Sequence, residues 1–200
     1  AHLCALKILS PSYLRSPQAL PRMKREFEML SQLQDPHIIT IYEFFTDPPF
    51  FSMELIPSIS LDQWSELRGP MPEDKLLYLA KTLSKTLAKT HEKGIIHRDL
   101  KPSNILIRPS DEPVLVDFGM MRVENGAPIT ATGIAIGTMG FIAPEQFDNA
   151  KEAGKPSDIF SLGITLLCLA TQMPPYSVTQ LLEKAEEYIS SSFFHVPSTL

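Results

Sequence analysis

Hydrophobic residues in the first part of the chain follow two different periods. A short strand is expected to end near Leu9, and a helix is predicted over residues 22–33 because its apolar residues recur every three or four positions. Two β-rich runs follow, at residues 38–45 and 50–56, with Asp47-Pro48-Pro49 as the turn between them. The helix residues expected to face this small sheet are Met23, Phe27, Leu30 and Leu33.

Beyond residue 57 the pattern becomes mainly helical. A helix is predicted from Pro72 to about Glu92, since acidic residues follow Pro72 and Gly94 ends the pattern. Short strands are expected at residues 104–107 and 114–116. The apolar run at 159–170 predicts a buried helix capped by Ser157 and Asp158, and it is far shorter than the roughly 20 residues of a membrane span. A more polar helix is predicted at residues 178–190.

Charge and cysteine content narrow the function classes. The net charge of -5 leaves no basic surface for nucleic acid, so we expect no nucleic-acid binding. Cys4 and Cys168 lie in apolar runs without paired or metal-ligand spacing, which predicts core packing in a reducing compartment. His37, His91 and His195 also lack ligand-like spacing and are expected to be surface or packing residues.

Two short motifs carry the chemistry. The first is His97-Arg98-Asp99-Leu100-Lys101-Pro102-Ser103-Asn104, and the second, after a short interval, is Asp117-Phe118-Gly119. Asp99 can accept the proton of an attacking hydroxyl, while Asn104 and Asp117 can hold the Mg²⁺ ions that neutralise charge on ATP phosphates. Their fixed order and separation predict a phosphoryl-transfer centre.

These motifs resemble the eukaryotic-type protein kinase superfamily, and two further stretches extend the resemblance over nearly every residue. Cys4-Ala5-Leu6-Lys7 is similar to the strand that carries the kinase lysine, and Ala143-Pro144-Glu145 is similar to the segment that closes the activation loop. The resemblance implies an α+β, bilobal kinase-like fold. Residues 1–56 would form a partial N-lobe and residues 57–200 a truncated, mainly helical C-lobe.

The resemblance also implies roles for single residues. Lys7 would contact the ATP phosphates and pair with Glu26, which precedes Leu30 by four residues; Glu28 would point away. Asp99 would orient the substrate hydroxyl. Lys101 and Thr138 match the pattern of serine/threonine kinases. His97 would stack with Phe118, Leu30 and Ile41 in the core, and Asp158 would hold the backbone of the catalytic loop.

A nucleotide pocket and a regulatory segment follow from the same resemblance. Met53 would be the gatekeeper, Glu54 and Ile56 would offer backbone groups to adenine, and Ala5 and Leu106 would lie above and below its ring. Arg98 would pair with a phosphothreonine, for which Thr130 and Thr132 are the candidates. Their segment is similar to that of bacterial serine/threonine kinases, and ordinary polar loop residues are the alternative for both threonines.

Two features of the family pattern are missing from this sequence. No Gly-x-Gly-x-x-Gly precedes Lys7. We therefore expect an internal fragment cut at both ends, which binds ATP weakly and turns over poorly. The family pairs the glutamate equivalent to Glu145 with a later arginine that this chain lacks, so an unpaired carboxylate is expected there.

Three functions are compatible with these motifs. The first is a protein serine/threonine kinase that uses ATP and Mg²⁺, acts on protein substrates and is activated by autophosphorylation of its activation loop. The second is a pseudokinase or scaffold with the same fold, and the third is a kinase of small molecules, which does not predict Lys101 and Thr138. We expect a cytoplasmic kinase domain with no membrane segment in this window; an anchor elsewhere in the parent protein and the oligomeric state stay open.

Overall fold

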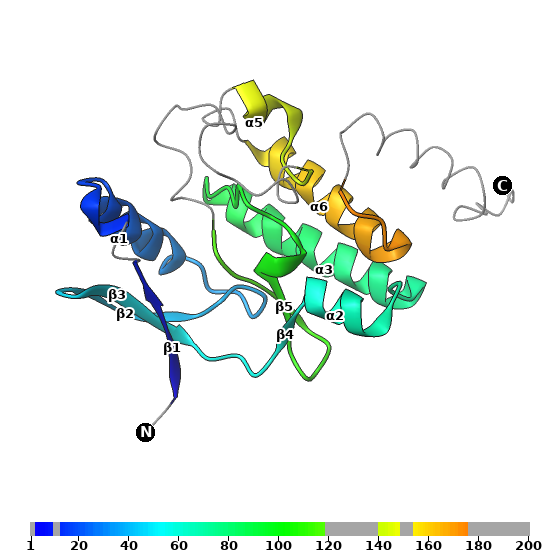
Figure 1. The fold of residues 1–200 in the computed structure, drawn as a ribbon, viewed down its shortest axis with the longest axis horizontal. Helices are drawn as coiled ribbons and strands as arrows, with labels where there is room; N and C mark the ends of the chain where they lie inside the picture. The colour runs from blue at the N-terminus through cyan, green and yellow to red at the C-terminus, as the bar shows by residue number, and fades with distance from the viewer. Residues whose placement is uncertain (1–2, 10–12, 119–139, 149–153, 176–200) are drawn as a thin grey trace, which may run out of the picture.

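Two small antiparallel sheets organise the chain. The computed structural model describes residues 3–9, 13–118, 140–148 and 154–175. In the first sheet the strands β1 (Cys4–Ile8), β2 (Ile41–Thr46) and β3 (Pro49–Glu54) lie in the order β1-β3-β2 (Figure 1). The predicted hairpin is confirmed, although β2 begins later than predicted and β3 begins at Pro49, which was predicted in the turn and pairs with Thr46.

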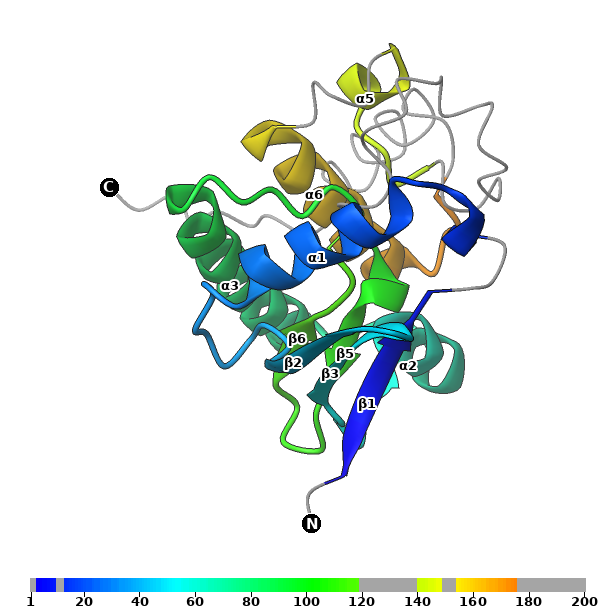
Figure 2. The same ribbon diagram turned by 90° about the vertical axis from the view of Figure 1, so that its left-hand side faces the viewer.

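Helix α1 (Ala19–Leu30) covers one side of this sheet (Figure 2). It begins and ends three residues earlier than the prediction of 22–33. Pro21 lies in its first turn, where a missing N–H costs nothing, so the proline does not delay the start. At the other end, Gln32 and Leu33 donate to Met29 and Leu30 and continue as tighter turns outside the α-helix.

The space between α1 and the sheet is filled with apolar side chains. Met23 and Phe51 are fully buried together with Leu9 and Ala19. The ring of Phe27 lies 5.5 Å from that of Phe44 and 6.0 Å from that of Phe51, centroid to centroid. These distances suit aromatic attraction, so Met23 and Phe27 pack on the sheet as predicted. Leu30 instead belongs to the large cluster formed with the later helices, and Leu33 packs on that cluster from beyond the end of α1.

The second sheet contains β4 (Ile59–Ser60), β5 (Ile105–Ile107) and β6 (Pro113–Leu115), in the order β4-β5-β6. Asn104, predicted within a strand, instead ends the short 3₁₀ turn η2 (Pro102–Asn104) that leads into β5. Proline at the start of this turn has no N–H to contribute to a ladder.

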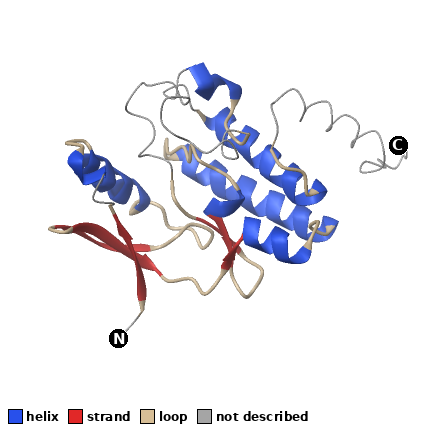
Figure 3. Cartoon of the chain, viewed as in Figure 1, coloured by secondary structure: helices blue, strands red, loops and turns tan. Residues whose placement is uncertain are grey.

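Helices contribute more residues than strands to the described chain (Figure 3). They are α2 (Leu61–Arg68), α3 (Glu73–Glu92), α5 (Pro144–Asp148) and α6 (Lys155–Thr171). Helix α3 has the predicted bounds and packs along α6, while α2 and α5 were not predicted individually. None of the helices in the described ranges is both long and apolar enough to cross a bilayer.

Helix α6 starts earlier than predicted. Gly154 is its N-cap, so Ser157 lies inside the first turn and its Oγ accepts the Gly154 N–H at 3.1 Å. The prediction that Ser157 is the N-cap was therefore wrong, because Gly154 takes that position. The Ser157 side chain still accepts the Gly154 N–H, which has no partner within the helix. The helix predicted at 178–190 lies outside the described residues.

The cysteine prediction was correct in part. Cys4 is exposed on β1, so the prediction that it packs in the core was wrong; alternate residues of an edge strand point to solvent. Cys168 on α6 is half-buried, and burial raises the pKa of its thiol to about 11. Neither thiol forms a disulfide within the described part of the chain.

The loop between α1 and β2 ties the first sheet to the helices. The Asp35 carboxylate lies 2.6 Å from the Lys89 Nζ of α3 and also accepts the His37 N–H at 2.9 Å. The His37 Nδ1 donates to the Pro113 carbonyl at 2.9 Å. Ile38 pairs in parallel with Leu115. His37 is thus a packing residue, as predicted.

Asp35→Asn is expected to reduce the free energy of unfolding by about 1 kcal/mol near neutral pH, because it removes the buried carboxylate that pairs with Lys89 and accepts the His37 N–H. Burial acts to raise the pKa of Asp35, but the hydrogen bonds from Lys89 and His37 outweigh it and hold the pKa below its ordinary value of 3.8. This stabilisation is therefore present above that value and is lost as the pH falls through the folded pKa.

Urea denaturation of both proteins at about pH 7 and about pH 3 measures the effect, and the difference should shrink at the lower pH. Glu28→Gln is the control, since Glu28 and Lys24 form an exposed pair at 3.9 Å that contributes little. An equal loss in both variants would contradict the assignment.

Candidate active site

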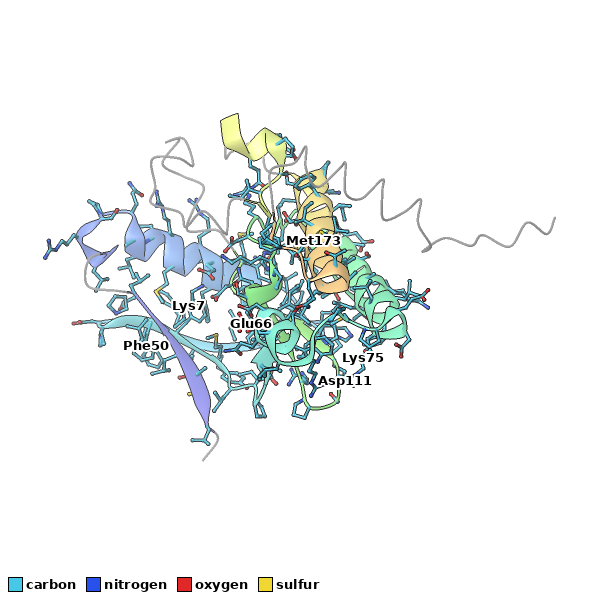
Figure 4. All side chains as sticks on the ribbon, turned by 45° about the vertical axis from the view of Figure 1, so that its right-hand side comes forward. Lys7, Phe50, Glu66, Lys75, Asp111 and Met173 are labelled. Carbon is cyan, nitrogen blue, oxygen red and sulfur yellow. The ribbon has the colours of Figure 1, made fainter. Side chains whose placement is uncertain are left out.

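Lys7 lies between two carboxylates. On β1 it stands opposite Phe51, and its side chain enters the space between the sheet and α1 (Figure 4). The Lys7 Nζ lies 2.5 Å from the Glu26 Oε1 and 2.9 Å from the Asp117 Oδ1. The expected Lys7–Glu26 ion pair is present, and Glu28 is exposed on another face, as the helix geometry predicted.

Burial and charge oppose each other in this group. Burial acts to lower the pKa of Lys7, but the charges of Glu26 and Asp117 outweigh it and raise the pKa, so the lysine stays cationic. Burial raises the pKa of Glu26, despite the attraction of Lys7. Its second oxygen, Oε2, has no hydrogen-bond partner among the described residues. The Glu26 carboxylate therefore depends on Lys7 for compensation of its buried charge.

The side chain of Asp99, the candidate catalytic aspartate, contacts two neighbouring residues of the same motif, Asn104 and Lys101. The Asn104 Nδ2 donates to the Asp99 Oδ2 at 2.9 Å and to the Asp99 carbonyl at 2.8 Å, and the Lys101 Nζ lies 3.1 Å from the same Oδ2. Val116, the residue before Asp117, donates its N–H to the Asn104 carbonyl at 3.0 Å. The two motifs of the sequence therefore meet at Asn104.

A buried carboxylate, Asp158 on α6, holds the loop backbone. It accepts the N–H groups of His97 and Arg98, both at 2.9 Å. Arg98 has a φ of 67°, a left-handed conformation that costs a non-glycine residue about 1–3 kcal/mol. The two hydrogen bonds stabilise this strained backbone, so the supporting role expected of Asp158 is confirmed.

His97 packs in the core, as expected. It is fully buried, and its ring lies 4.4 Å from that of Phe118, centroid to centroid. Phe118 and Leu30 belong to one buried cluster, with Ile41 packed against it. Burial lowers the pKa of His97, so its imidazole is neutral and its role is structural.

His91 was missed as a supporting residue. Its Nε2 donates to the Asp158 Oδ2 at 2.7 Å, and its side chain is buried. The sequence did carry a signal, because His91 continues the four-residue spacing of Leu79, Leu83 and Leu87 along the buried face of α3. A polar residue on such a face requires a partner, and here that partner is Asp158.

The residues expected around adenine come together at the junction of the two sheets. Ala5 stands opposite Met53 in the β1–β3 ladder. Met53 and Leu106 pack on one apolar cluster that includes Ile56. Glu54, expected to contribute only its backbone, also pairs through its side chain with Arg108 at 2.6 Å. A groove of about 420 Å³ lies nearby, outside the catalytic residues, and borders Arg108.

Asn104 and Asp117 offer oxygen ligands. The Asp117 side chain is about half exposed and engages Lys7 through Oδ1, while Asn104 uses its nitrogen for Asp99, which leaves its amide oxygen as the ligand atom. Within the described ranges, no group of three or more His, Cys, Asp or Glu side chains is placed to hold a metal. Two oxygen ligands suit Mg²⁺, which keeps water and phosphate in its remaining positions.

The regulatory candidates are described only in part. Thr130, Thr132, Thr138 and His195 lie outside the described residues. The Arg98 Nε is buried and has no hydrogen-bond partner in the described part of the chain, and burial lowers the pKa of its guanidinium. Such a group can gain an anionic partner.

Glu145 differs from the expectation. It accepts a hydrogen bond from the Ser157 Oγ at 2.6 Å, a partner that the sequence did not predict, although a hydroxyl carries no charge to replace that of the family's arginine. Ser157 reaches it because it lies in the first turn of α6. A hydroxyl donor here compensates part of the cost of burying the carboxylate.

Comparison with known proteins shows the family to which the chain belongs. A family model described as the protein kinase domain matches residues 1–198, and the chain belongs to this family. The serine/threonine-protein kinase PknD of Mycobacterium tuberculosis is 34% identical over 174 residues, covering 86% of this chain and 26% of PknD. PknL of the same species is 32% identical over 189 residues, covering 94% of this chain and 47% of PknL.

Solved structures include the same fold. A crystal structure of Rad53 residues 1–466 in complex with AMP-PNP matches with a TM-score of 0.68 and 26% identity, covering 90% of this chain and 45% of that chain. The expected α+β, bilobal kinase fold is confirmed. The chain spans less than half the length of the curated relatives given above.

Lys7→Met is expected to reduce the free energy of unfolding by about 3 kcal/mol at about pH 8, because it leaves the buried Glu26 charge uncompensated. Burial already raises the pKa of Glu26 above its ordinary value of 4.5. Without Lys7 the folded protein therefore binds a proton more readily than the unfolded chain, and the deficit should shrink as the pH falls toward about 5.

Chemical denaturation across this pH range tests the expectation. The double variant Lys7→Met/Glu26→Gln is the matched control, since it has no carboxylate at position 26 and should lose the pH dependence of the deficit. A deficit in Lys7→Met that is independent of pH would show that Glu26 does not depend on Lys7.

Proposed function

We propose that this chain is the catalytic part of a protein serine/threonine kinase, which transfers the γ-phosphoryl group of ATP to hydroxyl groups of protein substrates. One observation carries the proposal. The Asn104 side chain binds Asp99, and the Asn104 backbone binds Val116 beside Asp117, which in turn pairs with Lys7. All four polar groups needed for phosphoryl transfer therefore belong to one connected arrangement.

Each group has a distinct role in the proposed reaction. Lys7, kept cationic by Glu26 and Asp117, would bind the α- and β-phosphates. Asp99 would orient the attacking hydroxyl and accept its proton late, since the loose transition state requires positioning more than a strong base. Lys101, beside the Asp99 carboxylate, would donate to the phosphoryl group as charge develops on it. Thr138 is proposed to bond the catalytic aspartate.

Mg²⁺ is the proposed cofactor, with Asn104 and Asp117 as its protein ligands. When bound, it neutralises charge on the phosphates. The Lys7–Asp117 contact at 2.9 Å holds the Asp117 carboxylate near the lysine that would bind the same phosphates. This supports a site where lysine and metal ligand act on one polyphosphate chain.

The nucleotide base would lie at the junction of the sheets. Ala5, Met53 and Leu106 would enclose it, and the Glu54 carbonyl and the Ile56 N–H would bond its edge. This arrangement supports the proposed division into an N-lobe of residues 1–56 and a C-lobe of residues 57–200. The relative whose structure holds AMP-PNP supports the choice of an adenine nucleotide.

Regulation would act through Arg98. Its buried Nε lacks a partner in the described ranges, which supports pairing with a phosphate on Thr130 or Thr132.

We also propose that the domain works in the cytoplasm, since both cysteines are free thiols.

Asp99→Asn is expected to reduce phosphate transfer by about 10²–10⁴-fold, because the proton acceptor is removed while the nucleotide contacts remain. Incubation with labelled ATP and Mg²⁺, followed by mass spectrometry, measures transfer and locates the phosphate. The full-length protein is the form to use.

Asp111→Asn is the control, since Asp111 is exposed and contacts only Lys75 among the polar side chains described here. Label on Thr130 or Thr132 that vanishes only in Asp99→Asn would support a self-activating kinase. Nucleotide binding without any transfer, to itself or to generic protein substrates, would instead favour the scaffold alternative.

Arg98→Leu is expected to abolish the activating effect of loop phosphorylation, because no guanidinium remains to pair with the phosphate. The comparison is kcat for the phosphorylated and the phosphatase-treated forms of each protein. The two forms should differ in the wild type and coincide in the variant. A retained difference in Arg98→Leu would exclude Arg98 as the residue that binds the loop phosphate.

A further inference from the structure

An ion pair connects the two sheets beside the proposed nucleotide site. The Arg108 Nη1 lies 2.6 Å from the Glu54 Oε1, and the Arg108 Nη2 lies 2.9 Å from the Glu54 Oε2. Both side chains are about three-quarters buried. Two parallel bonds between a guanidinium and a carboxylate fix distance and orientation together, which a single lysine contact does not.

Both partners are attached to hydrogen-bonded backbone. Glu54 ends β3, where it stands opposite Cys4 and donates its N–H to the Thr40 carbonyl at 2.8 Å. Arg108 follows β5 and donates its N–H to the Glu112 carbonyl at 2.9 Å across the β5–β6 turn. The ion pair therefore joins two regular segments and holds the first sheet to the second.

The pair flanks the adenine-site residues. Ile56 lies two residues after Glu54, and Leu106 lies two residues before Arg108 on β5. Ile56, Leu106 and Met53 belong to one apolar cluster. A change in the distance between the ends of β3 and β5 would move Leu106 relative to the Glu54 carbonyl, the two groups proposed to contact opposite parts of the base.

We propose that the Glu54–Arg108 ion pair is a positioning device for the nucleotide site, which sets the spacing between the adenine-binding segment 54–56 and the Leu106 side chain. This inference rests on the proposed function and assigns a role to the side chains of Glu54 and Arg108. Neither side chain takes part in phosphate transfer. The hydrogen bond from Arg108 lowers the pKa of Glu54, so the pair is charged at neutral pH.

Arg108→Met tests the role. Methionine keeps most of the apolar part of the arginine side chain but removes the guanidinium that binds Glu54. The KM for ATP should therefore rise about fivefold, while kcat stays within about twofold. Glu54→Arg should have a similar or larger effect. The swap variant Glu54→Arg/Arg108→Glu restores opposite charges across the junction and should recover at least half of the lost nucleotide affinity.

Lys75→Met is the matched control. Lys75 on α3 pairs with Asp111 at 2.7 Å in the same β5–β6 turn, and the two side chains lie close together in Figure 4. That pair anchors the turn to a helix and does not reach the first sheet. The KM for ATP of Lys75→Met should equal that of the wild type, and thermal denaturation checks that all variants fold.

Equilibrium binding of ADP, measured by calorimetry, separates this inference from the proposed function. If the wild type binds ADP but transfers no phosphate, the proposed function fails, and a weaker ADP affinity in Arg108→Met would still support the positioning role. An unchanged affinity in Arg108→Met, or an equal loss in Lys75→Met, would overturn the positioning role. Absence of ADP binding by the wild type would overturn both.

Discussion

The buried carboxylate of Asp158 is the group on which the geometry of the catalytic loop depends. It accepts the N–H groups of His97 and Arg98 and the Nε2–H of His91. A buried charge of this kind is costly unless several donors surround it, and here three donors do so. In return, the carboxylate stabilises the left-handed backbone at Arg98, from which the chain turns into Asp99. Helix α6, which carries Asp158, therefore helps to position the proposed catalytic side chain of Asp99 through the loop backbone.

A second group of charges organises the other side of the site. Lys7 holds Glu26 and Asp117 together, although these carboxylates come from α1 and from the loop after β6. Each carboxylate raises the pKa of the lysine, and burial raises that of Glu26. This arrangement leaves a cation and an exposed carboxylate side by side, which is the pairing that a polyphosphate with a bound divalent cation requires.

Both ion pairs and apolar contacts join the first sheet and α1 to the rest of the described chain. The Asp35–Lys89 pair ties the loop after α1 to α3, the Glu54–Arg108 pair crosses at the edge of the adenine-site residues, and Ile38 pairs with Leu115 in the interior. Apolar packing at Ile39, Ile56 and Val114 fills the space between them. The positioning role proposed for the Glu54–Arg108 pair follows from its place at this junction, beside Ile56 and Leu106.

The sequence by itself determined the family, the β2–β3 hairpin, the bounds of α3 and the packing face of α1, because these depend on local motifs and on periodicity. Through their resemblance to a known pattern it also indicated Lys7, Glu26, Asp99, Asn104 and Asp117 as candidate site residues, and the structure shows contacts of Lys7 with Glu26 and Asp117 and of Asp99 with Asn104. Helix starts at Ala19 and Lys155 were misplaced, since proline in a first turn and a glycine N-cap are weak local signals. Only the tertiary structure decided the partners of His91, Glu145 and Glu54. These partners lie 67, 12 and 54 residues away along the chain, and no local pattern specifies which polar groups folding brings into contact.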